Sequence, residues 1–358
     1  MASVLSWARC FGLLLMNGLV IKVCRLSGPD WSVIYAGGGD SVNELRYALF
    51  TEPASATELG RIALWRVGKV VRHFLGEGFL VVTELNRLIP WWPQARYAFV
   101  SPPVVRQVLD VTQPPDSLYA GLKKGLRRHI RRVQAQGFTY EVSQRPEDFD
   151  LFYYQMYLPF IRGRYGELAT VTSYHLARRY FDQGELVFIR HDGQRIGGTL
   201  VRQTKNTYIA LLSGFWEEHE HQARRGASLA MYWFDICRAW ELGLRQVDLS
   251  RSRSRMSDGV FAFKQQWGAR PMSVKELHVK RMFLADRMSP DLCRYLNSQG
   301  FLTEREGNAW QVVLETDQVR VSETDRHRLD RRAQASGLAG LMVLGSPVAP
   351  SEARQTNR

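Results

Sequence analysis

The sequence predicts an α/β (α+β) protein in which a mixed sheet is flanked by helices and preceded by a shorter, more divergent α/β unit. The first observation is the order of predicted elements over residues 186–282, which runs β-β-β-α-β-α-β. The second is the composition of the 358 residues, of which 45% are hydrophobic and 23% charged. These proportions are typical of globular proteins and exclude a disordered chain or a disulfide scaffold as the main interpretation.

Basic residues outnumber acidic ones, with 48 Lys and Arg against 35 Asp and Glu, which gives a net charge of +13. This excess predicts an anionic partner: a nucleic acid, a phosphorylated cofactor or an acidic membrane surface. The cysteines are far apart and lack zinc-ligand spacing, so we expect free thiols and no metal site. They are Cys10, Cys24, Cys237 and Cys293. Free thiols favour a cytoplasmic location, and a peripheral position at the inner membrane stays open.

The role of residues 1–29 is left open by the sequence. The apolar run Phe11–Val20 imitates a signal-peptide core, but it falls short of the roughly 20 apolar residues that a spanning helix needs. We favour either a true start at Met16 or a first strand at Leu19–Val23.

Residues 30–115 are expected to form the divergent N-terminal unit. Strands are predicted at Trp31–Tyr35 and Phe79–Glu84, and apolar spacing over Leu59–Phe74 predicts a helix between them. The glycines at 37–39 lack the Lys and Ser/Thr that complete a phosphate-binding P-loop, so we interpret them as a turn.

The strongest helix signal covers Asp116–Gly137 and opens a domain expected over 116–283. Its apolar stripe is Leu118, Leu122, Leu126, Ile130 and Val133. Between these lie the cations Lys123, Lys124, Arg127, Arg128, Arg131 and Arg132. No acid separates the cations, so they repel one another. The basic face therefore either meets a phosphate-bearing ligand, with Arg127, Arg128 and Arg131 as anion or substrate contacts, or is a solubilising surface.

The rest of this domain alternates helices and strands. The predicted helices are 147–182, 225–242 and 258–267, and the predicted strands are 186–190, 195–203, 208–213, 245–250 and 273–282. Residues 284–345 are expected to form a C-terminal extension with a helix and a strand near Trp310–Leu314. Residues 346–358 are expected to be a loose tail.

The start of the helix near residue 225 has the character of an anion site. The residues there are Arg224, Arg225, Gly226, Ala227 and Ser228. Free N–H groups and the dipole at a helix N-terminus favour an anion, and the two arginines add positive charge. Gly226 would let the backbone approach a phosphate closely. The segment therefore predicts binding of a phosphorylated small-molecule donor.

Five motifs occur here in an order that resembles the FemAB-like acyltransferases, which have the GNAT (acetyltransferase) fold. A basic R-x-x-I-R-x-A-x-x-x-G helix corresponds to Arg127–Gly137, with Val133 in place of the Ala. The others are G-x-x-I-G-G at 193–198, A-x-x-x-G at 239–243, D-F-G-R-S at 248–252 and F-K-x-x-W-G at 263–268. The resemblance covers about residues 116–280 and is closest to CelD-like and FemAB-related proteins of bacterial exopolysaccharide and PEP-CTERM protein-sorting clusters.

The resemblance implies a GNAT-like sheet and the transfer of an acyl group, with acetyl-coenzyme A or another acyl-coenzyme A as the donor. The implied acceptor is a sugar or peptidoglycan-like precursor of the cell envelope or of a polysaccharide. The family's lysine carries over to Lys264 as a catalytic residue, and Asp248 is our candidate general base. The donor would lie along Arg224–Ser228 and between strands 208–213 and 245–250. Further expected contacts are Ser213 for the donor, and Arg251 and Tyr208 for an anion or substrate.

Two alternatives to this function stay open. The same fold can use aminoacyl-tRNA as its donor, which the basic face favours because phosphate contacts dominate nucleic-acid affinity. The fold can also serve as a non-catalytic module that binds an anionic polymer or lipid. Leu249 and Ser250 stand where the family has Phe-Gly, and this departure keeps the non-catalytic alternative open.

Overall fold

The computed structural model describes residues 20–39, 41–52, 54–85, 94–166, 169–216, 226–272, 274 and 280–345. The chain divides into two compact units. The first unit is drawn from Met1–Val105, Arg253–Asp258 and Ser273–Arg358, and the second from Arg106–Ser252 and Gly259–Met272. The boundaries of the five segments that the sequence suggests stay a prediction.

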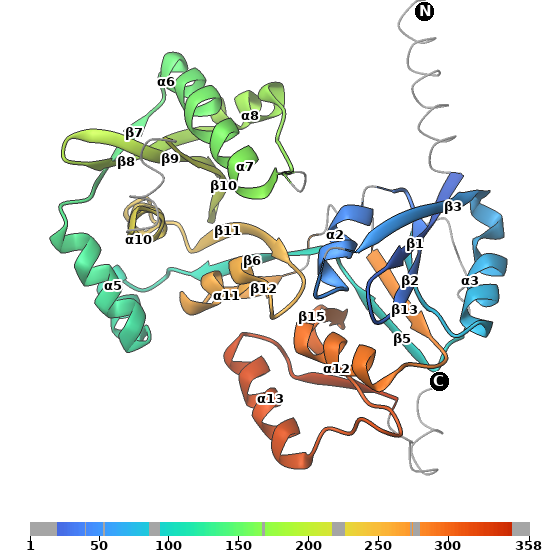
Figure 1. Ribbon diagram of the computed structural model, residues 1–358. Helices are drawn as coiled ribbons and strands as arrows, with labels where there is room; N and C mark the ends of the chain where they lie inside the picture. Colours follow the sequence, from blue (N-terminus) through green and yellow to red (C-terminus); the bar gives the residue numbers. More distant parts are fainter. Residues whose placement is uncertain are drawn as a thin grey trace, which may run out of the picture. The chain divides into compact units, whose positions relative to one another are not determined.

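The first unit is built on a six-stranded sheet in the order β3-β1-β2-β4-β13-β5 (Figure 1). Its strands are β1 (Val20–Ser27), β2 (Ser32–Gly37), β3 (Ser55–Ala63), β4 (Leu80–Leu85), β5 (Tyr97–Ser101) and β13 (Lys280–Ala285). The helices beside it are α2 (Val42–Ala48), η1 (Leu64–Arg66), α3 (Val67–Gly76) and α12 (Pro290–Gln299). Strands β2 and β4 pair in parallel, whereas β4, β13 and β5 pair antiparallel. The first strand predicted at Leu19–Val23 is confirmed as β1.

A smaller sheet in the same unit has the order β14-β15-β16. Its strands are β14 (Leu302–Arg305), β15 (Asn308–Leu314) and β16 (Leu341–Leu344), and helix α13 (Glu323–Ala335) lies beside them. Ser322 caps α13 because its side chain accepts a hydrogen bond from the Asp325 N–H. Strand β16 pairs with β15 in parallel and forms the edge of this sheet.

The helix predicted over Leu59–Phe74 is only half correct. Residues up to Ala63 belong to β3, and α3 begins at Val67. Strand β3 pairs along the whole of β1. This pairing at the edge of the sheet decides the local conformation, despite the helical spacing of the apolar residues. Leu59 is 45% exposed on this edge strand.

The glycine-rich turn after β2 binds a carboxylate of the protein itself. Glu84 accepts a hydrogen bond from the Gly38 N–H at 2.9 Å, and the Tyr35 hydroxyl accepts one from the Gly39 N–H at 3.0 Å. These N–H groups are therefore already satisfied, which agrees with a turn.

The second unit is built on a seven-stranded sheet in the order β12-β6-β11-β10-β9-β8-β7. Its strands are β6 (Val104–Asp110), β7 (Thr139–Ser143), β8 (Gly184–His191), β9 (Gln194–Gln203), β10 (Thr207–Phe215), β11 (Gln246–Arg253) and β12 (Arg270–Met272). Strands β7 to β10 form an antiparallel meander, and β11 then joins β10 in parallel. The predicted mixed sheet is confirmed.

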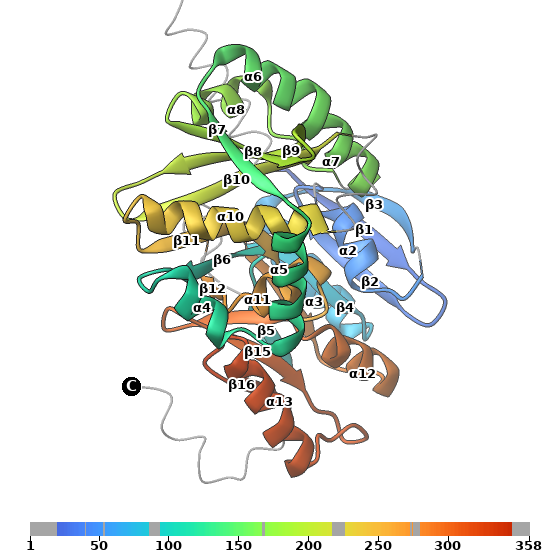
Figure 2. The same cartoon turned by 90° about the vertical axis from the view of Figure 1, so that its left-hand side faces the viewer.

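Helices cover both faces of this sheet (Figure 2). The helices are α4 (Pro115–Gly121), α5 (Lys124–Ala135), α6 (Pro146–Leu151), the π-helical η2 (Phe152–Tyr157), α7 (Leu158–Tyr165), α8 (Tyr174–Phe181), α10 (Ser228–Glu241) and α11 (Gly259–Gln266). Residues of η2 and α8 pack on Leu186, Phe188 and Leu200 of one face. Residues of α5 and α10 pack on Val187 and Val201 of the other.

Two expectations for this part of the chain are corrected. The single helix predicted over Asp116–Gly137 is broken, because Leu122 and Lys123 have extended backbone angles between α4 and α5. Gly121 ends α4, and Leu122 turns into the core there, where it is 8% exposed. Of the strand predicted at 273–282, Lys280–Met282 belong to β13, which lies in the sheet of the first unit, and Val274 lies outside any strand. Residues 273 and 275–279 lie outside the described residues.

None of the helices in the described part of the chain is both long enough and apolar enough to span a membrane.

Candidate functional site

Strands β10 and β11 pair over only three residue pairs and then separate (Figure 1). The last pair is Ile209 with Asp248. Strand β10 continues to Phe215 while still paired with β9, and its register shifts between Ala210 and Leu212. Beyond Ile209, the described residues offer no strand partner to the β11-facing edge of β10. This leaves backbone N–H and C=O groups at an opening in the middle of the sheet.

A strained residue marks the point where β11 turns away. Ser250 has φ of 64°, in the left-handed region that glycine adopts without strain. Its N–H donates a hydrogen bond of 2.8 Å to Asp248 Oδ1, and Asp248 is also ion-paired with Arg106 of β6. The family motif has glycine at the position of Ser250, so the departure noted in the sequence retains the backbone shape at a steric cost.

Lys264 holds the outer side of the same bend. Its Nζ donates to the backbone carbonyls of Ser250 at 3.2 Å and Arg251 at 2.8 Å. The residue is 3% exposed on α11. The structure therefore places the predicted catalytic lysine inside the protein, where its ammonium group satisfies carbonyls of β11.

Asp248 is equally enclosed. It is 1% exposed, and its two carboxylate oxygens contact the Ser250 N–H and the Arg106 guanidinium. In this arrangement the predicted general base fixes the bend of β11.

A buried polar pair that the sequence analysis missed lies beside this bend. Ser252 Oγ donates to Gln107 Oε1 at 2.6 Å, and Gln107 Nε2 donates to the Phe261 carbonyl at 3.0 Å. Gln107 is fully buried and thus ties β6, β11 and α11 together. The signal in the sequence was the Arg106-Gln107 pair inside the otherwise apolar strand β6.

The start of α10 lacks a side-chain cap. Ala227 occupies the cap position, and no side chain accepts a hydrogen bond from the first turn among the described residues. Gly226 has φ of 140°, and a Cβ added there would come within 3.1 Å of Val133 Cγ2 of α5. The absence of a Cβ at Gly226 therefore lets the backbone at the start of α10 lie close to the Val133 side chain of α5. Arg224 and Arg225 lie outside the described residues.

The basic face of α5 is exposed on the side opposite its apolar stripe. Leu126, Ile130 and Val133 are buried, as the helical spacing predicts. The exposed cations are Lys123, Lys124, Arg128, Arg131 and Arg132. None of these has an acidic partner in the described part of the chain. Arg127 is half-buried, and its Nη1 donates to the Ala120 carbonyl at 3.1 Å.

The remaining predicted contacts fall at different depths. Ser213 is half-buried on β10 beyond the point of separation, opposite Thr199 of β9. The Thr199 hydroxyl is buried and makes no hydrogen bond with any described residue. Arg251 is exposed on β11 next to the bend. Tyr208 is instead fully buried, and its hydroxyl donates to Asp235 Oδ1 at 3.3 Å.

Asp235 of α10 is a buried carboxyl beneath this sheet. Burial, together with the nearby Glu185, raises its pKa to about 8, although the hydrogen bond from Tyr208 opposes the rise. The Arg238 guanidinium pairs with Glu185 at 3.1 Å and therefore does not neutralise Asp235. Asp235 is therefore held protonated near neutral pH.

Within the described ranges, no three His, Cys, Asp or Glu side chains converge as metal ligands would. The polar groups around the opening are backbone amides, hydroxyls and arginines, which suit an anionic or acyl-bearing organic ligand.

Comparison with known proteins finds a matching family for part of the chain. Residues 120–265 match the family described as the acetyltransferase (GNAT) domain. Among solved structures, FemX is similar with 13% identity and a TM-score of 0.40, over 74% of this chain and 84% of FemX. L-PGS from Bacillus licheniformis is similar with 10% identity and a TM-score of 0.34, over 77% of this chain and 84% of that protein. No curated protein matches the chain. The stretch that matches the acetyltransferase (GNAT) domain, residues 120–265, contains the separated strands and the start of α10, and its match agrees with the resemblance that the motifs indicate.

Proposed function

We propose that the protein is an acyl-coenzyme A-dependent N-acetyltransferase that acts on a bacterial cell-envelope or polysaccharide precursor. The observation that carries the proposal is the separation of β10 from β11 after Ile209, next to the uncapped start of α10. An extended amide-containing chain needs a free strand edge, and a pyrophosphate needs free N–H groups and positive charge. The edge of β10 beyond Ile209 supports the first requirement, and the two arginines that precede α10 in the sequence support the second.

The described residues fit such a donor. The β11-facing edge of β10 would bind the amides of its pantetheine arm, with Ser213 beside them. The first turn of α10 would bind its phosphates. Arg224 and Arg225 precede this turn in the sequence and would add charge. Acyl-coenzyme A supplies a thioester whose C–S bond breaks as the acceptor nitrogen forms the amide, the amine proton passing to the released thiolate.

The chain's own residues would contribute mainly position. Lys264 and Asp248 hold the bend of β11 from two sides, so we assign them positioning roles. Arg251 extends from the same bend and is exposed, which suits contact with an anionic part of the acceptor. Placement of the reacting groups is one of the larger contributions to such a transfer.

The acceptor we propose is an amino sugar within a phosphorylated or lipid-linked precursor. The exposed cations of α5 support this, because they would attract phosphate groups of the precursor or of an anionic membrane to which it is attached. This proposal implies that the protein is cytoplasmic and contacts the membrane peripherally.

A transfer assay tests the proposal. The protein is incubated with acetyl-coenzyme A and with amino sugars or their nucleotide-linked forms, and thiol release is measured. We expect acceptor-dependent release, lowered about tenfold or more in kcat by Lys264→Met because the bend of β11 loses two hydrogen bonds. The control is Lys205→Met, which alters an exposed lysine of the same unit. Absence of release with every amino sugar would exclude this acceptor class.

The basic face of α5 favours one second candidate, an aminoacyl-tRNA-dependent transfer onto a peptidoglycan-like precursor. Five exposed cations on one helix can contact successive phosphates of a folded RNA. Such binding would weaken steeply with salt, whereas binding of a small coenzyme would change less. A tRNA titration between low and physiological salt distinguishes the two donors. Salt-insensitive or undetectable binding of tRNA would leave acyl-coenzyme A as the donor.

A further inference from the structure

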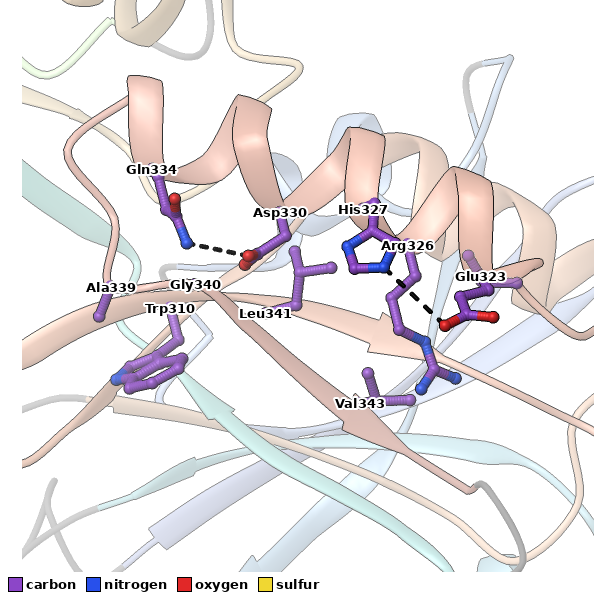
Figure 3. Close-up of a pocket in the computed structure, with 11 residues that line it drawn as sticks. Trp310, Glu323, Arg326, His327, Asp330, Gln334, Ala339, Gly340, Leu341 and Val343 are labelled. Atoms are coloured by element: carbon purple, nitrogen blue, oxygen red, sulfur yellow. Dashed lines mark hydrogen bonds and ion pairs between the residues drawn. The ribbon is translucent and has the colours of Figure 1, made fainter.

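A groove lies between α13 and the sheet β14-β15-β16, in the first compact unit and outside the residues that match the acetyltransferase family (Figure 3). Its volume is about 700 Å³. This is within the range of sites that bind small molecules, roughly 300–1,000 Å³. Neither the acyl transfer nor the basic face of α5 involves this groove.

The floor of the groove is apolar and contains an indole. Trp310 of β15 is half-buried there, and Leu341 and Val343 of β16 extend the apolar surface. Gly340 lies close to both Trp310 and the helix, since a Cβ added there would come within 3.2 Å of the indole and 3.0 Å of Asp330 Oδ1. A side chain at position 340 would therefore crowd both the aromatic platform and the carboxylate.

The facing wall is a polar stripe along α13. Glu323, His327, Asp330 and Gln334 follow one another at intervals of three or four residues, so they share one face of the helix (Figure 3). At 1.5 Å per residue the stripe is about 16 Å long. Gln334 Nε2 donates to Asp330 Oδ2 at 2.9 Å, so the stripe places an amide donor next to a carboxylate acceptor. The ligand that this wall fits is elongated and rich in hydroxyl groups.

The charges of the groove argue against an anionic ligand. Glu323 and Asp330 contribute two carboxylates. Arg326 is the arginine of the lining, and its Nη2 is paired with Glu315 Oε1 at 2.8 Å. A phosphate or uronate would therefore meet carboxylates without a surplus of cations.

We propose that this groove binds a neutral oligosaccharide. The C–H face of a sugar ring would pack on Trp310, since an indole offers a large flat apolar surface. The sugar hydroxyls would bond to Asp330, Gln334 and His327, which together provide donors and acceptors along the stripe. The inference rests on the groove alone and is independent of the proposed acyl transfer.

Calorimetric titration of the full chain tests the proposal. The probes are neutral tetrasaccharides, namely maltotetraose, cellotetraose and N-acetylated chitotetraose, with tetragalacturonate and adenosine as anionic and flat aromatic comparisons. We expect saturable binding of at least one neutral probe. Trp310→Leu and Asp330→Asn should each weaken it about tenfold, because one removes the platform and the other a charged acceptor.

Two matched variants make the result specific. Trp65→Leu removes a tryptophan that is 70% exposed on η1, and Arg331→Gln alters the neighbour of Asp330 that does not line the groove. Both should bind as the wild type does. The proposal is overturned if no neutral tetrasaccharide binds, if tetragalacturonate or adenosine binds more tightly, or if the control variants lose as much affinity as Asp330→Asn. Trp310→Leu could lose binding through a folding defect. Asp330→Asn keeps the shape of its side chain, so weaker binding by this variant reports on the groove itself.

Discussion

Ser250 occupies a backbone conformation that usually belongs to glycine, and it does so where β11 leaves β10. Its φ of 64° costs a residue with a Cβ roughly 1–2 kcal/mol. The conformation persists because Asp248 and Lys264 hold it from two sides. The bend is therefore built into the site rather than imposed by a ligand.

We predict that Ser250→Gly stabilises the protein by about 0.5–1 kcal/mol. Relief of the left-handed strain is partly offset by the greater freedom of glycine in the unfolded chain. Urea denaturation of wild type and variant measures the difference. The matched change Ser257→Gly, at an exposed residue without positive φ, should stabilise nothing. Destabilisation by Ser250→Gly would show that the strain is absent.

Asp235 makes stability depend on pH. Its folded pKa of about 8 lies above the ordinary value of 3.8, so the folded state keeps a proton that the unfolded state releases. The stability it contributes is complete below about pH 4 and is lost as the pH rises towards 8, with a slope of up to about 1.4 kcal/mol per pH unit.

Asp235→Asn should remove this dependence, because asparagine keeps an acceptor for Tyr208 without a titrating group. Denaturation midpoints measured from pH 5 to pH 8 should fall less steeply for the variant, which should be the more stable protein at pH 8. Asp291→Asn, with a side chain that is 75% exposed, serves as the control. Equal slopes for wild type and Asp235→Asn would contradict the protonated state.

Single residues show what sequence reasoning can and cannot reach. Lys264 was found through its motif, but only the structure reveals that its ammonium group faces two carbonyls. Gln107 was missed because a polar residue in a strand is usually at the surface, whereas this one bonds across three elements. Contacts between residues far apart in the sequence leave no periodic signal.

Helix α5 is the element with the clearest electrostatic role. Arg128, Arg131 and Arg132 are exposed on it and have no acidic partner among the described residues. We predict that changing all three to Gln reduces the salt slope of tRNA binding by about 2–3, since each lost phosphate contact removes nearly one released counterion. Fluorescence anisotropy at several salt concentrations measures it.

The control for this prediction is another helix with three exposed arginines. Arg328, Arg331 and Arg332 of α13 are likewise exposed, and their replacement by Gln changes the net charge equally. If both triple variants lower the slope alike, net charge and not the α5 face governs binding.

Elements with strong local signals were predicted, and those decided by distant pairing were not. The strands of the meander β8 to β10 and the helices α10 and α11 agree with their apolar spacing and turn residues. Strand β3 was taken for helix because its partner β1 decides its conformation. The break before α5 was missed because Leu122 fits both a helical stripe and a buried turn.

At the scale of the whole molecule, the residues that match the GNAT domain lie in the second compact unit except for Arg253–Asp258, and the first unit carries its own sheets and groove. The fold class followed from the order of elements in the sequence. The separation of β10 from β11 was also expected from the sequence, but only through the resemblance to the FemAB-like acyltransferases. The groove beside α13 had no sequence signal, because its lining comes from segments that pair only after folding.

The most direct test of the account is calorimetric titration with acetyl-coenzyme A at near-physiological salt. The account predicts saturable binding at one site, weakened about tenfold by Arg225→Ala through loss of a phosphate contact. Arg331→Ala, on α13, should bind as the wild type does. Absence of binding, or equal binding by Arg225→Ala, would contradict a donor site at the start of α10.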